Sequence, residues 1–507
     1  MTMLDYLKKR PMLLCALIAA AVCAVGYYSD AAVYIIGVGL ILLFFAMLYK
    51  RVNPVFPAVA LILVFISANL LYTRGKIEKI TEADGTETAG RFIVLESPEK
   101  YDGFYSAVLE AGGCPGLENG TRVLAFFYGN KTEFECGDII SAEISLRKAD
   151  GDYKTGSYAD KIYLTGSAEL TAVTEKGGDF ILSAFNNVRR YITDTLFANI
   201  GYREAATLAA VVFGDDSYFS EEFSANIIGS GVSHVMVVSG MHLAIIVSLV
   251  TRFSEKFVYS RGLKAFLMFL TVVLMTALCG FTKSIIRAGV CYIIYAFGIL
   301  LKRENDSVNT LGGAVSLILA AEPFAVFSVS FQLSVLSTLG IVAAAVPVMR
   351  YITDKRLFKS RLLLNILSSF VVTLSALLFT LPVTVYVFGY ISAVSVITNL
   401  LISYAVTAAL SVSAVGLVVF AFFPSAGGLL LRAAGAVTEY INFIIDEFGS
   451  LPFAVVTFGK YTFVLSVILL LAITAALFSC KKREDMLKLK KLNGKIVREG
   501  GNKLKWR

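Results

Sequence analysis

The sequence predicts a polytopic α-helical membrane protein with about 10–12 transmembrane helices and one small β-rich domain outside the membrane. Of the 507 residues, 57% are hydrophobic and only 17% are charged, whereas soluble proteins have about 45–50% apolar and about 25% charged residues. Apolar stretches long enough to cross a bilayer recur along the chain, and only residues 74–190 form a sizeable polar region. These observations exclude a water-soluble enzyme.

The predicted transmembrane helices follow from the length of the apolar runs. Because each helical residue rises 1.5 Å, about 20 apolar residues cross the hydrocarbon core. Runs without any charged residue occupy residues 11–29, 31–49, 52–73, 223–251, 265–282, 323–349 and 461–480. The charge-free stretch 362–431 is long enough for two helices, with Gly389 and Tyr390 at the expected turn. Three segments that are short, amphipathic or interrupted by an arginine complete the upper count: residues 284–301, 308–321 and 428–448.

Basic residues in short loops favour the cytoplasmic side, which predicts the orientation of the chain. The basic cluster at residues 8–10 places the N-terminus inside, and three crossings then place residues 74–190 outside. The C-terminus returns to the cytoplasm if segments 308–321 and 428–448 both cross. The excess of basic residues in the tail 481–507 equals the whole net charge of +8. A basic segment next to the last span is explained first by membrane topology and contact with anionic lipid, and only second by binding of nucleic acid. We expect a cell-membrane protein with both termini in the cytoplasm.

The predicted domain order is a three-span segment at 1–73, an extracytoplasmic β-rich domain at 74–190, a multi-span membrane domain at 191–480 and a basic tail at 481–507. Stretches such as RFIVL, TRVLAFFY and DIISAEISL, separated by Gly, Asp and Asn, predict a small barrel or sandwich in the second segment. This segment is net acidic, unlike a nucleic-acid-binding face. An external location allows either a disulfide between Cys114 and Cys136 or two unpaired small apolar side chains.

The most informative membrane segment is GSGVSHVMVVSGMHLAII, residues 229–246, because it holds both histidines of the chain, His234 and His242. Ser239 and His242 are three residues apart, which predicts that they share one helix face. The spacing favours a packing seam, in which small residues allow close approach and each histidine bonds a neighbouring backbone. A Ser239–His242 hydrolase dyad is the sharper alternative, but same-helix geometry is awkward and no orienting acid is visible. Metal binding by the two histidines lacks a third ligand nearby. We therefore expect no metal and no cofactor, and, since the dyad is also disfavoured, no enzyme.

Other polar residues interrupt the remaining apolar segments. Arg287 lies about one turn into its segment, where it must snorkel, find a partner or line a polar path. Asp306 is expected to cap the helix that follows it, with Asn309 on the first turn. For Gln332 and Asn399, interhelical hydrogen bonding and a polar conduit are both open. Together these residues indicate a helical bundle with a polar interior, which is typical of a transporter or channel.

The order of these motifs resembles that of the ComEC family of competence proteins, which are inner-membrane DNA-uptake channels. The resemblance covers residues 196–480, and its motifs follow one another in the family's order. The matching positions are Ser233, His234, Ser239, Gly240 and His242 in the first motif, Ser284 and Arg287 in an S-x-x-R-A motif, Arg303, Asp306 and Asn309 in an R-x-x-D-x-x-N motif, Gln332 in FQLS, and Asn399 in a late N-L-L element.

The resemblance implies a channel subunit that passes single-stranded DNA inward, with these residues lining or bracing the path, and an OB-like fold for the external domain. It implies single-stranded DNA and membrane lipids as partners, besides a separate nuclease, a DNA receptor, a cytoplasmic helicase and further copies of the chain. Many family members carry a metallo-β-lactamase-like domain. This chain stops 27 residues after Cys480 without an H-x-H-x-D-H motif, so no nuclease activity is expected. The alternative is a transporter or flippase of another polyanionic or lipid-linked solute.

Overall fold

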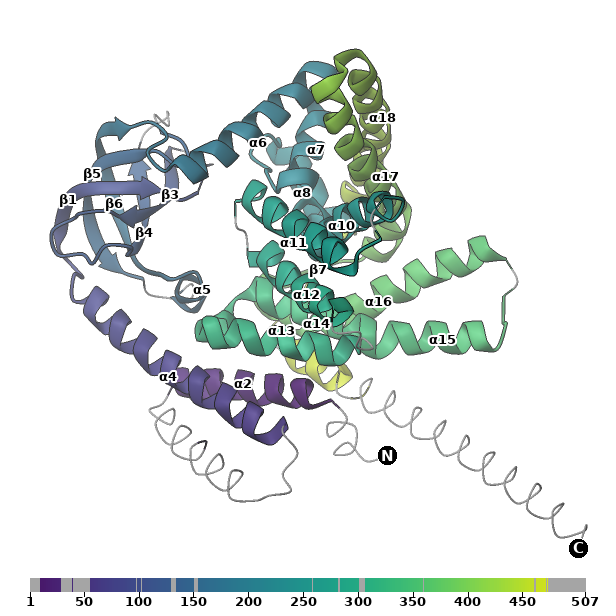
Figure 1. Ribbon diagram of the computed structural model, residues 1–507, viewed down its shortest axis with the longest axis horizontal. Helices are drawn as coiled ribbons and strands as arrows, with labels where there is room; N and C mark the ends of the chain where they lie inside the picture. Colours follow the sequence, from purple (N-terminus) through teal and green to yellow (C-terminus); the bar gives the residue numbers. More distant parts are fainter. Residues whose placement is uncertain are drawn as a thin grey trace, which may run out of the picture.

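The computed structural model describes residues 10–28, 39, 55–96, 98–101, 103–128, 134–149, 154–257, 259–280, 283–300, 306–358, 360–459, 462–470 and 472. Nearly all of the predicted span 31–49, much of 461–480, Arg303 and the basic tail 481–507 lie outside these residues. The described chain is mostly helical, with one small β domain to the side of the helices (Figure 1). Helix α4 (Val55–Thr81) leads into this domain, and α6 (Phe180–Asn199) leads out of it.

Five of the six strands described in the β domain pair in a closed ring. Around the ring lie β1 (Glu87–Val94), β5 (Ile139–Lys148), β6 (Ile162–Glu175), β4 (Arg122–Tyr128) and β3 (Phe104–Ala111), which pairs with β1 again. The β4–β6 pairing is parallel and the other ring pairings are antiparallel. The short β2 (Glu99–Tyr101) pairs with the start of β3, next to the stretch of β3 that pairs with β1.

The core of the β domain follows from the alternation in its strands. On β4, for example, buried residues alternate with half-buried ones up to the exposed Tyr128. This period of two places one face of each strand inside the ring. The innermost side chains are Phe92, Leu109, Phe127, Ile144 and Leu164. The predicted small β domain is therefore confirmed.

Among the described residues, four helical stretches are long and apolar enough to cross a membrane: Val329–Asp354, Arg361–Phe388, Ser395–Phe422 and Pro424–Gly449. They correspond to α14 (Val329–Gly340) continuing through η2 (Ile341–Ala345) into α15 (Val346–Asp354), then α16, α17 and α18. Large apolar side chains remain exposed on these helices, such as Leu362, Tyr386 and Val418. This architecture is consistent with a membrane protein, because such surfaces are stable against lipid.

Shorter apolar helices cover Pro11–Gly26, Gly240–Ser254, Gly262–Leu278, Ser284–Ala296 and Ser307–Ala321. They belong to α2 (Pro11–Tyr28), α10 (Gly240–Ser254), α11 (Arg261–Leu278), α12 (Lys283–Leu300) and α13 (Ser307–Ala321). Helices of this length are shorter than the roughly 20 residues that span the hydrocarbon core. The total of 10–12 crossings stays a prediction.

The predicted span 223–251 is wrong as a single helix. The structure divides it into α8 (Glu221–Ser230), α9 (Ser233–Met236) and α10. Gly231 ends α8 with a φ of 74°, a left-handed conformation that glycine adopts without steric cost. Ser239 is extended, with φ −124° and ψ 172°, and starts α10 as its N-cap. The hydropathy of the run reflects its apolar composition and does not detect the breaks in the helical backbone at Gly231 and Ser239.

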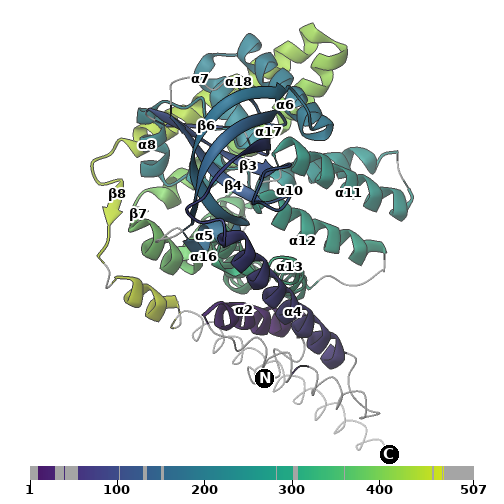
Figure 2. The ribbon, with the colours of Figure 1, turned by 90° about the vertical axis from the view of Figure 1, so that its left-hand side faces the viewer.

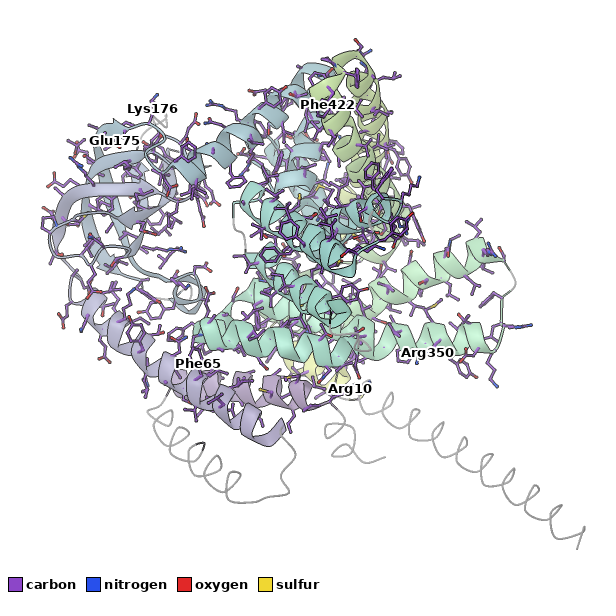
Figure 3. All side chains as sticks on the ribbon, in the orientation of Figure 1. Arg10, Phe65, Glu175, Lys176, Arg350 and Phe422 are labelled. Atoms are coloured by element: carbon purple, nitrogen blue, oxygen red, sulfur yellow. The ribbon has the colours of Figure 1, made fainter. Side chains whose placement is uncertain are left out.

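One end of the molecule contains α6, α7 (Tyr202–Phe213), α17 and α18 (Figure 2). Buried residues of these helices and of α8–α9 share one apolar core, which includes Leu208, Ile402, Leu410, Leu431 and Ile441. The short strands β7 (Tyr390–Ser392) and β8 (Val455–Thr457) pair beside it. Helices α15 and α16 extend away from the bundle, with Arg350 exposed on α15 (Figure 3).

The β domain contacts the helices next to α14. Its helix α5 (Lys154–Ala159) places the Tyr158 ring against Phe324, 6.3 Å between centroids, in the 3-10 turn η1 (Pro323–Phe327). Lys161 pairs with Glu322 at 2.6 Å immediately before η1. These contacts connect the β domain to the start of the helix that carries the FQLS motif.

Candidate functional site

Ser239 and His242 form a capping box at the start of α10, in which Ser239 is the extended N-cap residue and His242 the third residue of the helix. The backbone N–H of Ser239 donates to His242 Nδ1 at 3.0 Å. In return, the N–H of Met241 donates to Ser239 Oγ at 3.3 Å. A capping box satisfies helix N–H groups that have no intrahelical partner. The proximity of Ser239 Oγ to Nδ1, 3.1 Å, therefore has a structural cause, and the dyad alternative gains no support.

The two histidines lie in different environments. His242 is fully buried, and its Nε2 has no hydrogen-bond partner among the described residues. His234, on the single turn α9, keeps accessible surface but is surrounded by protein, bonds the backbone of Gly231 and lies close enough to His242 to interact with it electrostatically. Ser233 is exposed beside it, and its carbonyl accepts from the N–H of Val237 at 3.2 Å.

Arg287 is buried on α12, with 6% of its surface exposed, so it does not snorkel to the surface. Its Nη2 donates to the carbonyl of Ser330 at 2.9 Å and to Ser330 Oγ at 3.2 Å. The guanidinium carbon lies 5.9 Å from the centroid of the Phe331 ring. Nε and Nη1 are buried and have no partner in the described part of the chain. Ser284, one turn earlier on α12, is half-buried.

A cavity of about 230 Å³ lies beside this guanidinium and is lined by residues of four helices. Gly240 of α10, Arg287 of α12, and Ser334 and Thr338 of α14 contribute to its lining. The rest of the lining is mostly apolar: Ala288, Cys291, Tyr292, Leu311, Ala314, Val315, Ile318, Phe331 and Val335. Residues from three separate predicted motifs thus meet at one place.

Asp306 and Asn309 connect α13 to the N-terminal helix and do not line this cavity. Asp306 caps α13, as predicted, since its Oδ1 accepts from the N–H groups of Val308 and Asn309 at 3.0 and 3.3 Å. Its other oxygen pairs with Arg10 Nε at 2.8 Å. Asn309 Oδ1 accepts from the N–H of Met12 at 3.0 Å. Two motif residues therefore attach the start of α2 to the bundle.

Gln332 and Asn399 satisfy local backbone groups. Gln332 Nε2 donates to the carbonyl of Val326 at 2.9 Å and so braces the turn before α14. Asn399 is buried in α17, where Nδ2 donates to the carbonyl of Ser395 at 2.7 Å and the Asn399 carbonyl accepts from Ser403 Oγ. Both are bracing residues in this structure.

The disulfide alternative for Cys114 and Cys136 is not realised, because both are free thiols. Cys114 Sγ donates to the carbonyl of Arg91, and Cys136 Sγ to that of Leu95, each at 3.2 Å. Burial raises the pKa of both thiols, for Cys136 to about 11. The alternative of two unpaired cysteines is the one that the structure contains.

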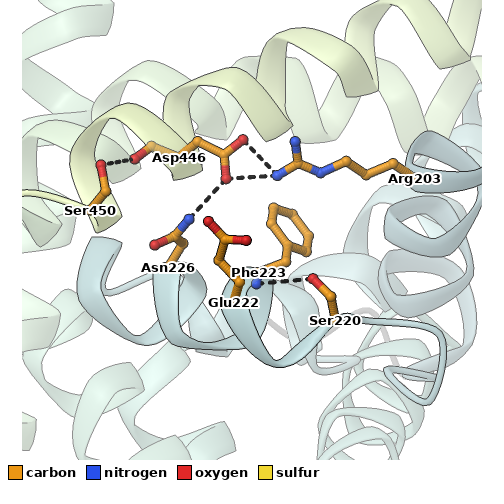
Figure 4. Close-up of a pocket in the computed structure, with 7 residues that line it drawn as sticks. All are labelled: Arg203, Ser220, Glu222, Phe223, Asn226, Asp446 and Ser450. Atoms are coloured by element: carbon orange, nitrogen blue, oxygen red, sulfur yellow. Dashed lines mark hydrogen bonds and ion pairs between the residues drawn. The ribbon is translucent and has the colours of Figure 1, made fainter.

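A second, larger cavity of about 360 Å³ lies between α7, α8 and the end of α18 (Figure 4). Here Arg203 Nη2 lies 2.6 Å from both carboxylate oxygens of Asp446, and its guanidinium carbon lies 4.4 Å from the centroid of the Phe223 ring. Asn226 Nδ2 also donates to Asp446, at 3.0 Å. The charge of this arginine is therefore already neutralised, unlike that of Arg287. Sequence patterns did not single out this site. The signal that could have found it is Asp446, an acidic residue in the amphipathic segment 428–448.

The profile of the competence protein family matches residues 211–483 of the chain, a segment that contains α10, α12, α13, α14 and α16–α18. The chain belongs to this family. It is similar to ComE operon protein 3 of Bacillus subtilis (strain 168), with 24% identity over 275 residues. This alignment covers 54% of the chain and 34% of the relative, so the chain matches about a third of that relative's length. No solved structure matches the chain.

Proposed function

We propose that this competence-family protein is a subunit of a DNA-uptake channel that moves single-stranded DNA across the cytoplasmic membrane. One observation carries the proposal: residues of the Ser239–His242, Ser284–Arg287 and FQLS motifs meet around one cavity that holds a buried, unneutralised cation. A nucleic-acid strand carries one negative charge per nucleotide. Conduction of such a strand requires cationic groups that bind each phosphate weakly enough to release it.

The same proposal gives roles to the other motif residues. Gly240 and Arg287 contribute to the path, and His242 orients the start of α10. Asp306, Asn309, Gln332 and Asn399 brace the surrounding helices through the hydrogen bonds described above. We assign no catalytic residue, and we propose a multi-pass arrangement with both termini in the cytoplasm.

We also propose that the β domain is OB-like and extracytoplasmic. The closed ring of five strands, with a parallel β4–β6 pair among antiparallel ones, supports this assignment. Since the domain is acidic, a separate DNA receptor would deliver the strand to the helices. A separate nuclease, a cytoplasmic helicase, membrane lipids and further copies of the chain complete the proposed partners.

Deletion of the gene in its own competent host tests the function. We expect labelled DNA to remain bound at the cell surface but to stop entering the cytoplasm, and a plasmid copy of the gene to restore entry. An Arg287→Ala copy should restore little entry, whereas an Arg350→Ala copy, altered at an exposed arginine outside the motifs, should restore it fully. Unchanged DNA entry in the deletion strain would disprove the proposal and favour a transporter or flippase of another polyanionic or lipid-linked solute.

A further inference from the structure

The Arg287 side chain lacks an acidic partner and acceptors for some of its N–H donors. Of its five N–H donors, the two on Nη2 face Ser330, while those on Nε and Nη1 have no partner among the described residues. No ion pair to Arg287 is formed by any described acidic residue, in contrast to Arg203 with Asp446. A buried charge without a partner is unfavourable. An anion that entered the adjoining cavity would remove this penalty.

The N-terminus of α10 adds a second preference for an anion at the same cavity. Gly240, the first residue of this 15-residue helix, lines the cavity together with Arg287. The first turn of a helix carries a partial positive charge from its aligned peptide dipoles. A Cβ on Gly240 would lie only 3.3 Å from the Cβ of Ala288, so glycine allows α10 and α12 to approach closely here.

The cavity has room for a small anion. Its volume of about 230 Å³ is below the roughly 300–1,000 Å³ of pockets that hold drug-sized ligands. The hydroxyl-bearing Ser334 and Thr338 line it beside the apolar Leu311 and Val315. These dimensions are sufficient for a single tetrahedral oxyanion beside Arg287.

We propose that this cavity binds one phosphate group, and that the group is a backbone phosphodiester of the passing strand. Nε and Nη1 of Arg287 are covered in this structure, so a small shift of the guanidinium toward the cavity brings them to the phosphate oxygens, while Ser330 remains the partner of Nη2. The start of α10 adds its partial charge from the other side. The assignment to a nucleic-acid strand rests on the function proposed above, whereas the affinity for phosphate rests on the geometry alone.

The test uses the full-length protein in a maltoside detergent, which carries no phosphate, and a fluorescent 12-nucleotide oligothymidylate. Binding is measured by anisotropy across a salt series for the native chain, Arg287→Gln and Arg203→Gln. For single strands, each neutralised phosphate contributes about 0.7 to the slope of log affinity against log salt. We expect Arg287→Gln to weaken binding about tenfold and to lower the slope by about 0.7. Arg203→Gln is the matched control and should leave the slope unchanged, because Asp446 already neutralises that arginine.

Three competitors identify the source of the phosphate: inorganic phosphate, phosphatidylglycerol in mixed micelles, and an oligothymidylate with an uncharged methylphosphonate backbone. Failure of the uncharged oligomer to compete supports the proposal. An equal slope for the native chain and Arg287→Gln overturns it. Binding of phosphatidylglycerol or inorganic phosphate at Arg287 without any binding of the oligonucleotide overturns the assignment to a strand. If gene deletion abolishes DNA entry while the native chain and Arg287→Gln have equal slopes, the phosphate site is wrong and the proposed function stands. If deletion leaves DNA entry unchanged while Arg287→Gln lowers the slope, the proposed function is wrong and the phosphate site stands.

Discussion

The backbone N–H of Ser239 donates to Nδ1 of His242 at 3.0 Å, so the histidine acts as part of a helix cap. Because Nδ1 is the acceptor, the neutral ring carries its proton on Nε2, which is buried without a partner among the described residues. The pair that resembles a nucleophile and a base by spacing is therefore a device that starts α10 immediately after an extended residue.

Removal of this cap should destabilise the protein. We expect His242→Ala to lower the stability by about 1–2 kcal/mol, since the Ser239 N–H loses its acceptor and a buried side chain is truncated. His242→Asn, whose side-chain oxygen is able to accept the same bond, should recover part of the loss. The thermal midpoint in detergent, followed with a dye that reacts with the buried Cys15, Cys23 and Cys279 on unfolding, measures both. Equal midpoints for Ala, Asn and native chains would contradict a capping role.

Removal of the unpaired charge at Arg287 should stabilise the protein, whereas removal of the His242 cap should destabilise it. In the absence of any anion, Arg287→Met is expected to raise the thermal midpoint, by about 1–3 kcal/mol in stability, because a buried uncompensated cation is replaced by an apolar chain. The matched variant Arg203→Met should lower the midpoint, because it removes the ion pair with Asp446 and the contact with Phe223. A lowered midpoint for both would indicate that Arg287 is structural.

Gly229 should not tolerate a side chain. A Cβ at this position would collide with the carbonyl of Gly449 at the end of α18, and backbone atoms yield little. Gly229→Ala is therefore expected to cost about 1–3 kcal/mol through overpacking. Gly75→Ala on α4 is the control, since no atom lies within 4 Å of its added Cβ, and there the higher helix propensity of alanine should stabilise by up to about 1 kcal/mol. Similar midpoints for the two variants would refute the close approach of α8 and α18.

Cys114 and Cys136 should react as thiols without prior reduction. After denaturation in a non-reducing buffer, both should be alkylated by maleimide, which mass spectrometry of the peptides detects. In the folded protein the labelling rate of Cys136 should keep rising as pH increases toward 11, instead of levelling near the ordinary value of 9.0, because burial raises the pKa and only the thiolate reacts. Lack of labelling until a reductant is added would reveal a disulfide.

Two substitutions should distinguish the two roles of Asp306, which are the N-cap of α13 and the ion pair with Arg10. Asp306→Asn keeps a capping oxygen and loses the ion pair with Arg10, so we expect a small loss, about 0.5 kcal/mol or less, at this partly exposed pair. Asp306→Ala also loses the cap of α13 and should cost about 1–2 kcal/mol. Arg10→Gln should match Asp306→Asn. An Asn variant as damaged as the Ala variant would show that the ion pair dominates.

Much of the fold was accessible from sequence because it depends on local patterns. Alternation along RFIVL and TRVLAFFY specified strands β1 and β4, and the long charge-free stretch 362–431 specified α16 and α17. The span 223–251 was mispredicted because a hydropathy window averages over Gly231 and Ser239, where the backbone leaves the helix. Average composition predicts burial or contact with lipid and says little about backbone dihedral angles.

The sequence by itself determined the class of this protein, the place of its β domain and the polar positions that interrupt its apolar segments. Only the tertiary structure decided which of those positions meet. Arg287 faces Ser330 from 43 residues away, and Asp306 holds Arg10 from 296 residues away, whereas Ser239 binds the nearby His242. The physical reason is that short-range periodicity sets which face of a segment is buried, but the partner of a buried polar group is chosen by how helices distant in the chain pack together.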